Sequence, residues 1–162
     1  MKKVSMPDLS QNGVILLPSI TEEMAKRIAN NIVEIAKKDG KGPISVCILD
    51  IKREKKCKIS MDGVLPISVR LSFDKAFTAV MIECSTRKFK NILKDGNATT
   101  TDFSPNFTAL AGGIPIVAPL DNNEYVAIGS IGVSDRTSDE DEELAIEGLE
   151  SEKRFQHEKE RS

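Results

Sequence analysis

The chain has 162 residues, of which 40% are hydrophobic and 30% charged, and 23 Lys plus Arg against 25 Asp plus Glu give a formal net charge of -2. These values are typical of one soluble domain. No run of about 18 apolar residues is present, which excludes a membrane-spanning helix, and the balanced charge argues against nucleic acid as a partner. The basic Met1-Lys2-Lys3 lacks the apolar centre of a signal peptide after it, so a cytoplasmic protein with no membrane partner is expected.

The cysteine and histidine content excludes several common kinds of site. Cys47, Cys57 and Cys84 form no C-x-x-C pair, so we expect reduced thiols rather than a disulfide framework or a zinc site. His157 is the only histidine and lies in a charged tail. Neither a histidine-based triad nor a zinc cluster with several imidazoles can be built within one chain, and no metal site is predicted.

The first part of the chain predicts an extension followed by a helix. Residues 1–18 are mostly polar, with a possible edge strand at Val14 to Leu17. After Ser19 or Thr21 as the N-cap, apolar residues recur at intervals of three and four up to Ile35, which indicates an amphipathic helix. Asp39-Gly40 ends it.

A strand pair is predicted next. The run Ile44 to Ile51 is apolar apart from Ser45 and Asp50 and rich in β-branched residues, which is typical of a strand buried on both faces. Lys52 to Lys56 forms a charged hairpin tip. Apolar and polar residues then alternate from Cys57 to Met61, so the partner strand has one solvated face, and Asp62-Gly63 makes the following turn.

Two helices and a loop are predicted in the middle of the chain. Apolar residues at helical spacing indicate a helix from about Ser68 onwards. Ser85 or Thr86 is expected to cap a shorter helix. The segment Asn97 to Asn106 contains three consecutive threonines and shows no periodicity, so we expect a loop that lies over a site.

The last part predicts a hairpin and a helix. Ile114 to Leu120 and Tyr125 to Val133 form the hairpin, and two prolines confine its first arm to a sheet edge or to irregular pairing. Thr137 or Ser138 caps a helix whose acidic first turn suits the helix dipole. Residues 150–162 are a charged tail, either frayed helix or disordered. The expected fold is α/β of the α+β kind: a mainly antiparallel five-stranded sheet flanked by helices, with the domain at residues 19–149.

Two features suggest a ligand site, and each also has a structural interpretation. Asp62 belongs to a turn, but with Lys75 it could form a polar pair at the mouth of a pocket, where the ammonium would meet a carboxylate or phosphate. Gly112-Gly113 could expose backbone N–H groups to an anion, although the surrounding elements differ from those of a phosphate loop. The sequence leaves both interpretations open.

Several blocks, taken in order, resemble the GlcG/HbpS family, which includes the C-terminal domain of PduO-type proteins. The resemblance covers about residues 19–149. The blocks are Ile20-Thr21, Ile44-Ser45-Val46, Met61-Asp62-Gly63, Lys75-Ala76-Phe77-Thr78-Ala79, Gly112-Gly113-Ile114-Pro115-Ile116, Ala127-Ile128-Gly129, Ile131-Gly132-Val133-Ser134 and Glu140-Asp141-Glu142.

The resemblance implies a profilin-like domain that forms homo-dimers and assemblies up to octamers. Some relatives bind haem, and others accompany corrinoid, glycolate or diol metabolism. The family pocket implies a set of ligand-binding residues around the Met-Asp-Gly turn, the lysine-containing helix and the Gly-Gly-x-Pro strand. These are Met61, Asp62, Gly63, Lys75, Thr78, Gly112, Gly113 and Pro115.

The chain differs from the family pattern at three places. Ile51-Lys52-Arg53-Glu54 stands where relatives usually carry a glycine, Ser60 replaces a common arginine, and Asp135 replaces a common glycine. The domain also contains no histidine, so a haem iron would need a cysteine, methionine, lysine or threonine side chain, or Tyr125.

The leading hypothesis is a non-enzymatic, oligomeric accessory protein that holds a small organic ligand or a tetrapyrrole, haem or cobalamin, near Asp62 and Lys75. One alternative is an enzyme acting on a small anionic metabolite, with Asp62 as acid or base and Lys75 as electrostatic stabiliser. Another is a structural assembly subunit without a ligand.

Overall fold

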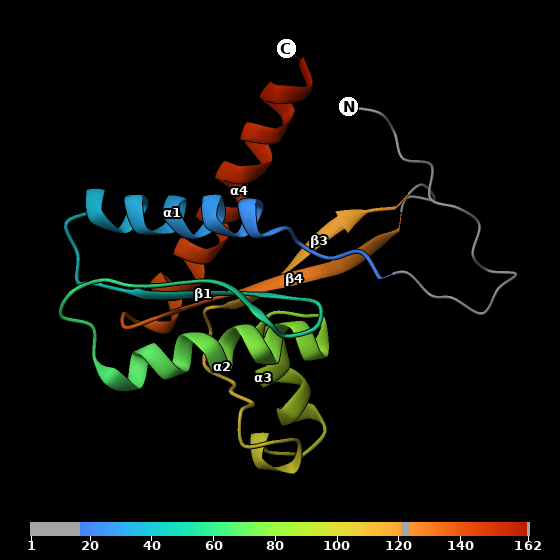
Figure 1. Cartoon of the computed structure of the whole chain (residues 1–162). Helices are drawn as coiled ribbons and strands as arrows, with labels where there is room; N and C mark the ends of the chain where they lie inside the picture. The colour runs from blue at the N-terminus through green and yellow to red at the C-terminus, as the bar shows by residue number, and fades with distance from the viewer. Residues whose placement is uncertain (1–16, 121–123, 162) are drawn as a thin grey trace, which may run out of the picture.

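The computed structural model describes residues 17–120 and 124–161. Four helices and four strands make up the domain (Figure 1). They are α1 (Glu22–Lys38), β1 (Ser45–Asp50), β2 (Lys55–Ser60), α2 (Pro66–Ile82), α3 (Thr86–Asp95), β3 (Gly113–Pro119), β4 (Tyr125–Ser134) and α4 (Ser138–Arg161), with a short 3-10 turn at Thr100–Asp102. Within the described ranges, no helix has the length and apolar character needed to cross a membrane.

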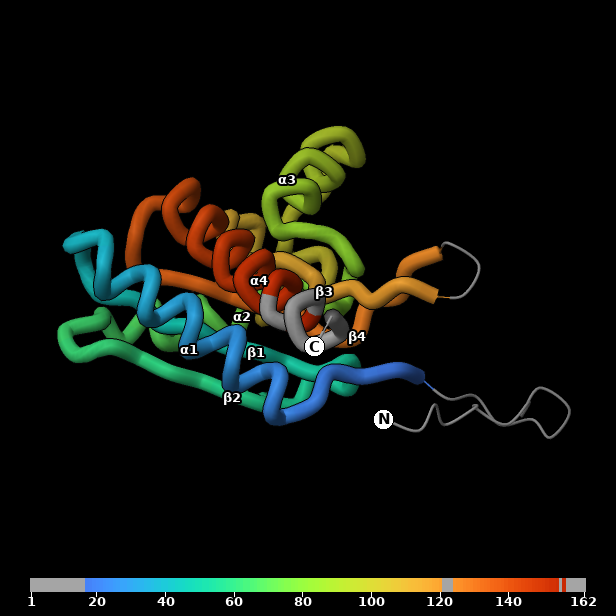
Figure 2. The backbone as a smooth tube through the Cα atoms, turned by 90° about the horizontal axis from the view of Figure 1, so that it is seen from above, coloured from blue at the N-terminus to red at the C-terminus, as the bar shows by residue number. Residues whose placement is uncertain are grey.

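The four strands form one antiparallel sheet in the order β2-β1-β4-β3. Helices α1 and α4 cover one face and α2 covers the other, so the sheet is the middle of three layers (Figures 1 and 2). The predicted α+β class is confirmed. The strand expected at Val14 to Leu17 falls almost entirely outside the described residues, and Leu17 itself is not in a strand.

The first helix begins at Glu22, directly after the second of the two predicted N-caps. Thr21, rather than Ser19, is the N-cap, and its hydroxyl accepts a hydrogen bond from the Met24 amide at 3.2 Å. Glu22 and Glu23 lie in the positive first turn, and Lys37 and Lys38 in the last turn. These charges suit the helix dipole and stabilise the helix ends.

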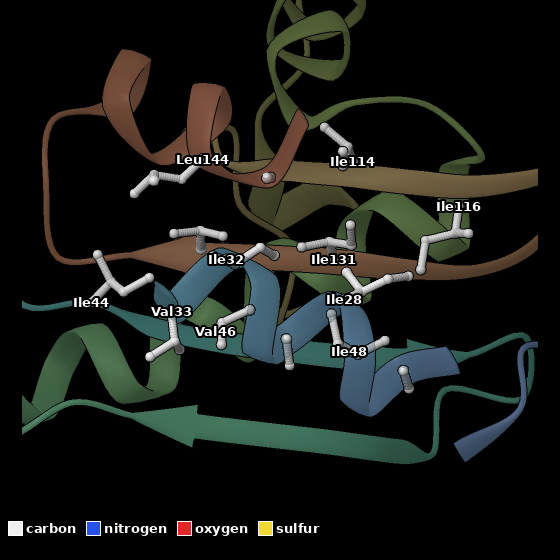
Figure 3. Packing of buried hydrophobic residues seen from close by; sticks show 14 of the residues in the cluster. Ile28, Ile32, Val33, Ile44, Val46, Ile48, Ile114, Ile116, Ile131 and Leu144 are labelled. Carbon is white, nitrogen blue, oxygen red and sulfur yellow. The ribbon is translucent and has the colours of Figure 1, made fainter. Parts of the chain in front are cut away.

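The core lies mainly between α1, α4 and the sheet. Every residue of β1 is buried, as its largely apolar sequence predicts. Val46 and Ile48 point towards α1, where Ile28, Ile32 and Val33 meet them (Figure 3). Cys47 and Leu49 belong to a second, smaller cluster with α2. The strand therefore contributes apolar side chains to both layers, which explains why it does not alternate.

The β3–β4 hairpin confirms the edge position that its prolines predict. β3 pairs only with β4 in the described sheet, so Pro115 and Pro119 interrupt no second ladder. On β4, a side chain at Gly132 would overlap the carbonyl oxygen of Ser72 and lie 2.6 Å from the amide nitrogen of Ala76. This glycine lets α2 approach the sheet backbone.

Five phenylalanine rings form a chain of contacts on the side of the sheet that α2 covers. The centroids of rings in contact are 5.2 to 5.9 Å apart, and the ring pairs are stacked, edge-on or tilted. The rings belong to Phe73, Phe77, Phe89, Phe103 and Phe107. Phe103 comes from the segment predicted as a loop, Asn97 to Asn106, and Phe107 follows it directly. Their contacts with Phe77 and Phe89 fix this segment against α2 and α3.

Two of the departures from the family pattern fall on left-handed backbone. Arg53 in the β1–β2 turn has a φ of 68°, and Asp135 after β4 has a φ of 112°. Only glycine adopts such φ values without steric cost. A glycine, which the family resemblance implies near Arg53 and at Asp135, would carry no such cost, whereas this chain tolerates the strain.

Replacing Asp135 by Gly is expected to stabilise the fold by about 0.5 to 1 kcal/mol. Relief of backbone strain contributes about 1 to 3 kcal/mol, and the greater entropy of an unfolded glycine offsets part of it. The substitution also removes the carboxylate that accepts from the Leu65 amide at 3.4 Å. Urea denaturation measures the change. The control is Asp95→Gly at the end of α3, which is expected to destabilise; an Asp135→Gly midpoint below that of the wild type would contradict the strain argument.

The last helix extends beyond the predicted domain. α4 continues to Arg161 through the region expected to be frayed helix or disordered. Glu152 within it has no exposed surface. Its carboxylate contacts Arg27 of α1, which lies on the same face of the sheet (Figure 1).

Candidate functional site

Lys75 is buried in α2 and forms an ion pair inside the domain. Its side chain is 3% exposed, and Nζ donates to Asp141 Oδ2 at 2.7 Å and to the carbonyl of Val133 at 2.8 Å. Burial lowers the pKa of Lys75 and raises the pKa of Asp141, while the ion pair opposes both changes. The pair connects α2 to the first turn of α4.

The two glycines predicted as an anion-binding loop surround this ion pair. A Cβ atom at Gly112 would lie 2.9 Å from Lys75 Nζ, and one at Gly113 would overlap the Lys75 carbonyl. The amide of Gly113 donates to Thr86 Oγ1 at 3.1 Å. Both glycines therefore allow close packing around Lys75, and the Gly113 N–H is already paired.

The remaining predicted site residues are dispersed. Thr78 is buried, donates to the Asp74 carbonyl and accepts from the Thr108 amide, at 2.8 and 2.9 Å. Asp62 is exposed in the turn after β2, between Met61 and Gly63. Pro115 is half-buried on β3.

The structure thus brings together Lys75, Gly112 and Gly113 and adds Asp141 to them. Among the ion pairs of the described residues, Lys75 meets Asp141 rather than Asp62. Sequence reasoning placed Asp141 within an acidic helix start, and no sequence signal separates it from its acidic neighbours. Only the three-dimensional contact between Lys75 of α2 and the first turn of α4 distinguishes it.

A groove lies elsewhere, between the β3–β4 hairpin and the helices on the α1 side of the sheet. Its volume is about 550 Å³, within the usual range for sites that bind small organic molecules. Aliphatic side chains and one tyrosine form most of its walls. The lining residues are Met24, Ile116, Val117, Ala118, Pro119, Tyr125, Ile128, Leu149, Glu152, Lys153 and Gln156.

The polar side of the groove is formed by α4. The carboxylate of Glu152 accepts from Arg27 Nε at 3.1 Å, from Arg27 Nη2 at 2.8 Å and from Gln156 Nε2 at 3.0 Å. Gln156 Nε2 also lies 3.6 Å from the sulfur of Met24. Tyr125 is 70% exposed at the groove. From the sequence, Tyr125 was expected as a possible iron ligand, whereas Glu152, Lys153 and Gln156 fell in the predicted charged tail.

The cysteines offer little reactive sulfur. All three are free, and Cys47 is fully buried. Burial raises the pKa of the Cys47 thiol to about 12 and also raises the pKa values of Cys57 and Cys84. Higher thiol pKa values leave less thiolate at neutral pH. In residues 17–120 and 124–161, no group of three or more His, Cys, Asp or Glu side chains is placed to hold a metal ion.

A sheet between two helical layers, with a largely apolar groove beside one edge hairpin, defines a small α+β domain with a candidate ligand site. Residues 20–150 match the model of the family described as haem degrading protein HbpS-like. The chain belongs to the HbpS-like family.

Individual relatives agree with this assignment. The protein GlcG of Escherichia coli K12 is 28% identical over 115 residues, 71% of this chain and 81% of that protein. The crystal structure of HbpS is 29% identical with a TM-score of 0.75, covering 86% of this chain and 94% of HbpS. A crystal structure of PduOC in complex with haem, 21% identical, has the same fold with a TM-score of 0.70 over 81% of this chain and 93% of PduOC.

Proposed function

We propose that this protein binds a tetrapyrrole of the haem class in the groove beside the β3–β4 hairpin. The groove carries the proposal, because it joins a volume of about 550 Å³ and apolar walls with side chains that ligate iron. The family description names haem, and a structural neighbour is a haem complex. The role is that of a binding or accessory protein.

The residues present fit such a ligand. Ala118, Pro119 and Leu149 are at least partly exposed and offer an apolar surface for the flat macrocycle. The phenol of Tyr125 and the thioether of Met24 are both side-chain types that hold haem iron in proteins. No histidine is among the described side chains, so these two groups replace the imidazole. When bound, the iron would supply redox and oxygen chemistry.

Titration of the purified protein with haem tests the proposal. A saturable shift of the Soret absorption with one haem per subunit is expected, and cobalamin titrated in parallel identifies the preferred tetrapyrrole. Ala118→Phe fills the groove and should weaken haem binding at least tenfold. Tyr125→Phe or Met24→Leu should change the bound spectrum, because each removes an iron ligand.

The matched control is Ala98→Phe, which adds the same ring between α3 and the following 3-10 turn, among residues that do not line the groove. It should bind haem as the wild type does. No saturable shift, or equal affinity in the Ala118→Phe variant, would refute the proposal for this groove.

Self-association is the second part of the proposed role. Leu65 and Ile67 at the start of α2 are 60% and 57% exposed, and Met81 near its end is 43% exposed. A helix with apolar residues on its outer side as well as its inner side favours a partner there. Assembly into dimers or larger oligomers stays a prediction.

A further inference from the structure

One wall of the groove lies outside the family-matched part of the chain. The match ends at residue 150, whereas Glu152, Lys153 and Gln156 follow it in the same helix and line the groove. The opposite walls, from β3 and β4, lie within the match. The part of α4 that follows residue 150 therefore forms one wall of the groove.

A buried ion pair holds that part of α4 in place. Glu152 has no exposed surface, and its carboxylate receives three N–H groups from Arg27 and Gln156. Arg27 is fixed on its other side by Glu23 at 2.8 Å. A two-point contact between guanidinium and carboxylate sets direction as well as distance. The ion pair thereby fastens α4 at Glu152 to the N-terminal half of α1.

The ion pair also determines which groups face the groove. Because Arg27 neutralises Glu152, the buried carboxylate adds no net negative charge to the wall. Lys153 beside it is half-exposed and reaches Glu150 at 3.0 Å. Surface pairs of this kind contribute little energy, so the ammonium is able to turn to a ligand. The α4 wall is thus suited to an anionic group on an otherwise apolar molecule.

We propose that Arg27 and Glu152 are positioning residues that hold the α4 wall and, through Lys153, select an apolar ligand that carries carboxylates. This inference rests on the proposed function for its ligand class, a tetrapyrrole with free propionate groups. Neither residue touches the iron; both act through the position of α4.

The test compares full-length Glu152→Gln with Glu147→Gln, an exposed glutamate in the same helix that does not line this groove. Glu152→Gln should increase amide hydrogen exchange at residues 149–156 at least tenfold and weaken haem binding at least tenfold. Glu147→Gln should change neither. Lys153→Gln should weaken binding of haem but not of haem dimethyl ester, which lacks the carboxylates.

The two readouts separate this inference from the proposed function. If the wild type binds no haem, the proposed function and the ligand class fall together, and exchange alone decides whether the ion pair holds the wall. Unchanged exchange in Glu152→Gln overturns the positioning role, and faster exchange with unchanged haem affinity overturns the selective role. If Glu152→Gln does not fold, Arg27→Lys serves instead, since it keeps the charge but loses the two-point contact.

Discussion

Replacing Lys75 by Met is expected to destabilise the domain by about 3 to 5 kcal/mol, because it leaves the carboxylate of Asp141 buried without its cation. Asp141 is 1% exposed, and besides Lys75 its carboxylate accepts from the amide of Arg136 at 3.2 Å. Urea denaturation followed by circular dichroism measures the loss. Lys37→Met, at an exposed pair with Glu34, should change stability by less than about 0.5 kcal/mol.

A double variant decides whether the loss comes from the unpaired charge. Lys75→Met with Asp141→Leu removes both charges and should recover most of the stability, since apolar replacement of a buried pair is often neutral. A Lys75→Met protein as stable as the wild type would contradict the structural role of the pair. It would also return weight to the alternative in which Lys75 meets a ligand.

Gly132→Ala is expected to cost about 3 kcal/mol, at the upper end of overpacking substitutions. The added methyl group would overlap the Ser72 carbonyl, and that atom belongs to the backbone of α2. A flexible side chain could move aside, but a helix must shift as a unit. Thermal unfolding should show a lower midpoint, together with changed exchange of the α2 amides.

Gly42→Ala is the matched control for this effect. A Cβ atom at Gly42 would meet nothing within 4 Å, so the same substitution there should be close to neutral. Equal stabilities of the Gly132 and Gly42 variants would contradict the close packing of α2 against β4.

Much of the fold was predictable because it depends on local pattern. The largely apolar sequence of β1 and the prolines of β3 indicated a central and an edge strand, and both are present. The choice between Ser19 and Thr21 as the N-cap of α1 was left open, because serine and threonine both cap helices.

The candidate site was less predictable because its contacts join distant segments. Asp141 meets Lys75 across 66 positions and Glu152 meets Arg27 across 125. Asp141 and Glu152 both lie in highly charged segments, where the sequence does not distinguish a buried carboxylate from a solvent-exposed one. Helical periodicity in the tail was too weak to show that Glu152 faces α1.

The placement of Tyr125 has a practical consequence. The sequence contains one tyrosine and no tryptophan, and that tyrosine lies at the groove. Intrinsic near-ultraviolet emission above the phenylalanine background therefore arises from a single known position. A haem that absorbs at the emission wavelength would quench it by energy transfer, so occupancy of the groove becomes measurable in the unlabelled protein.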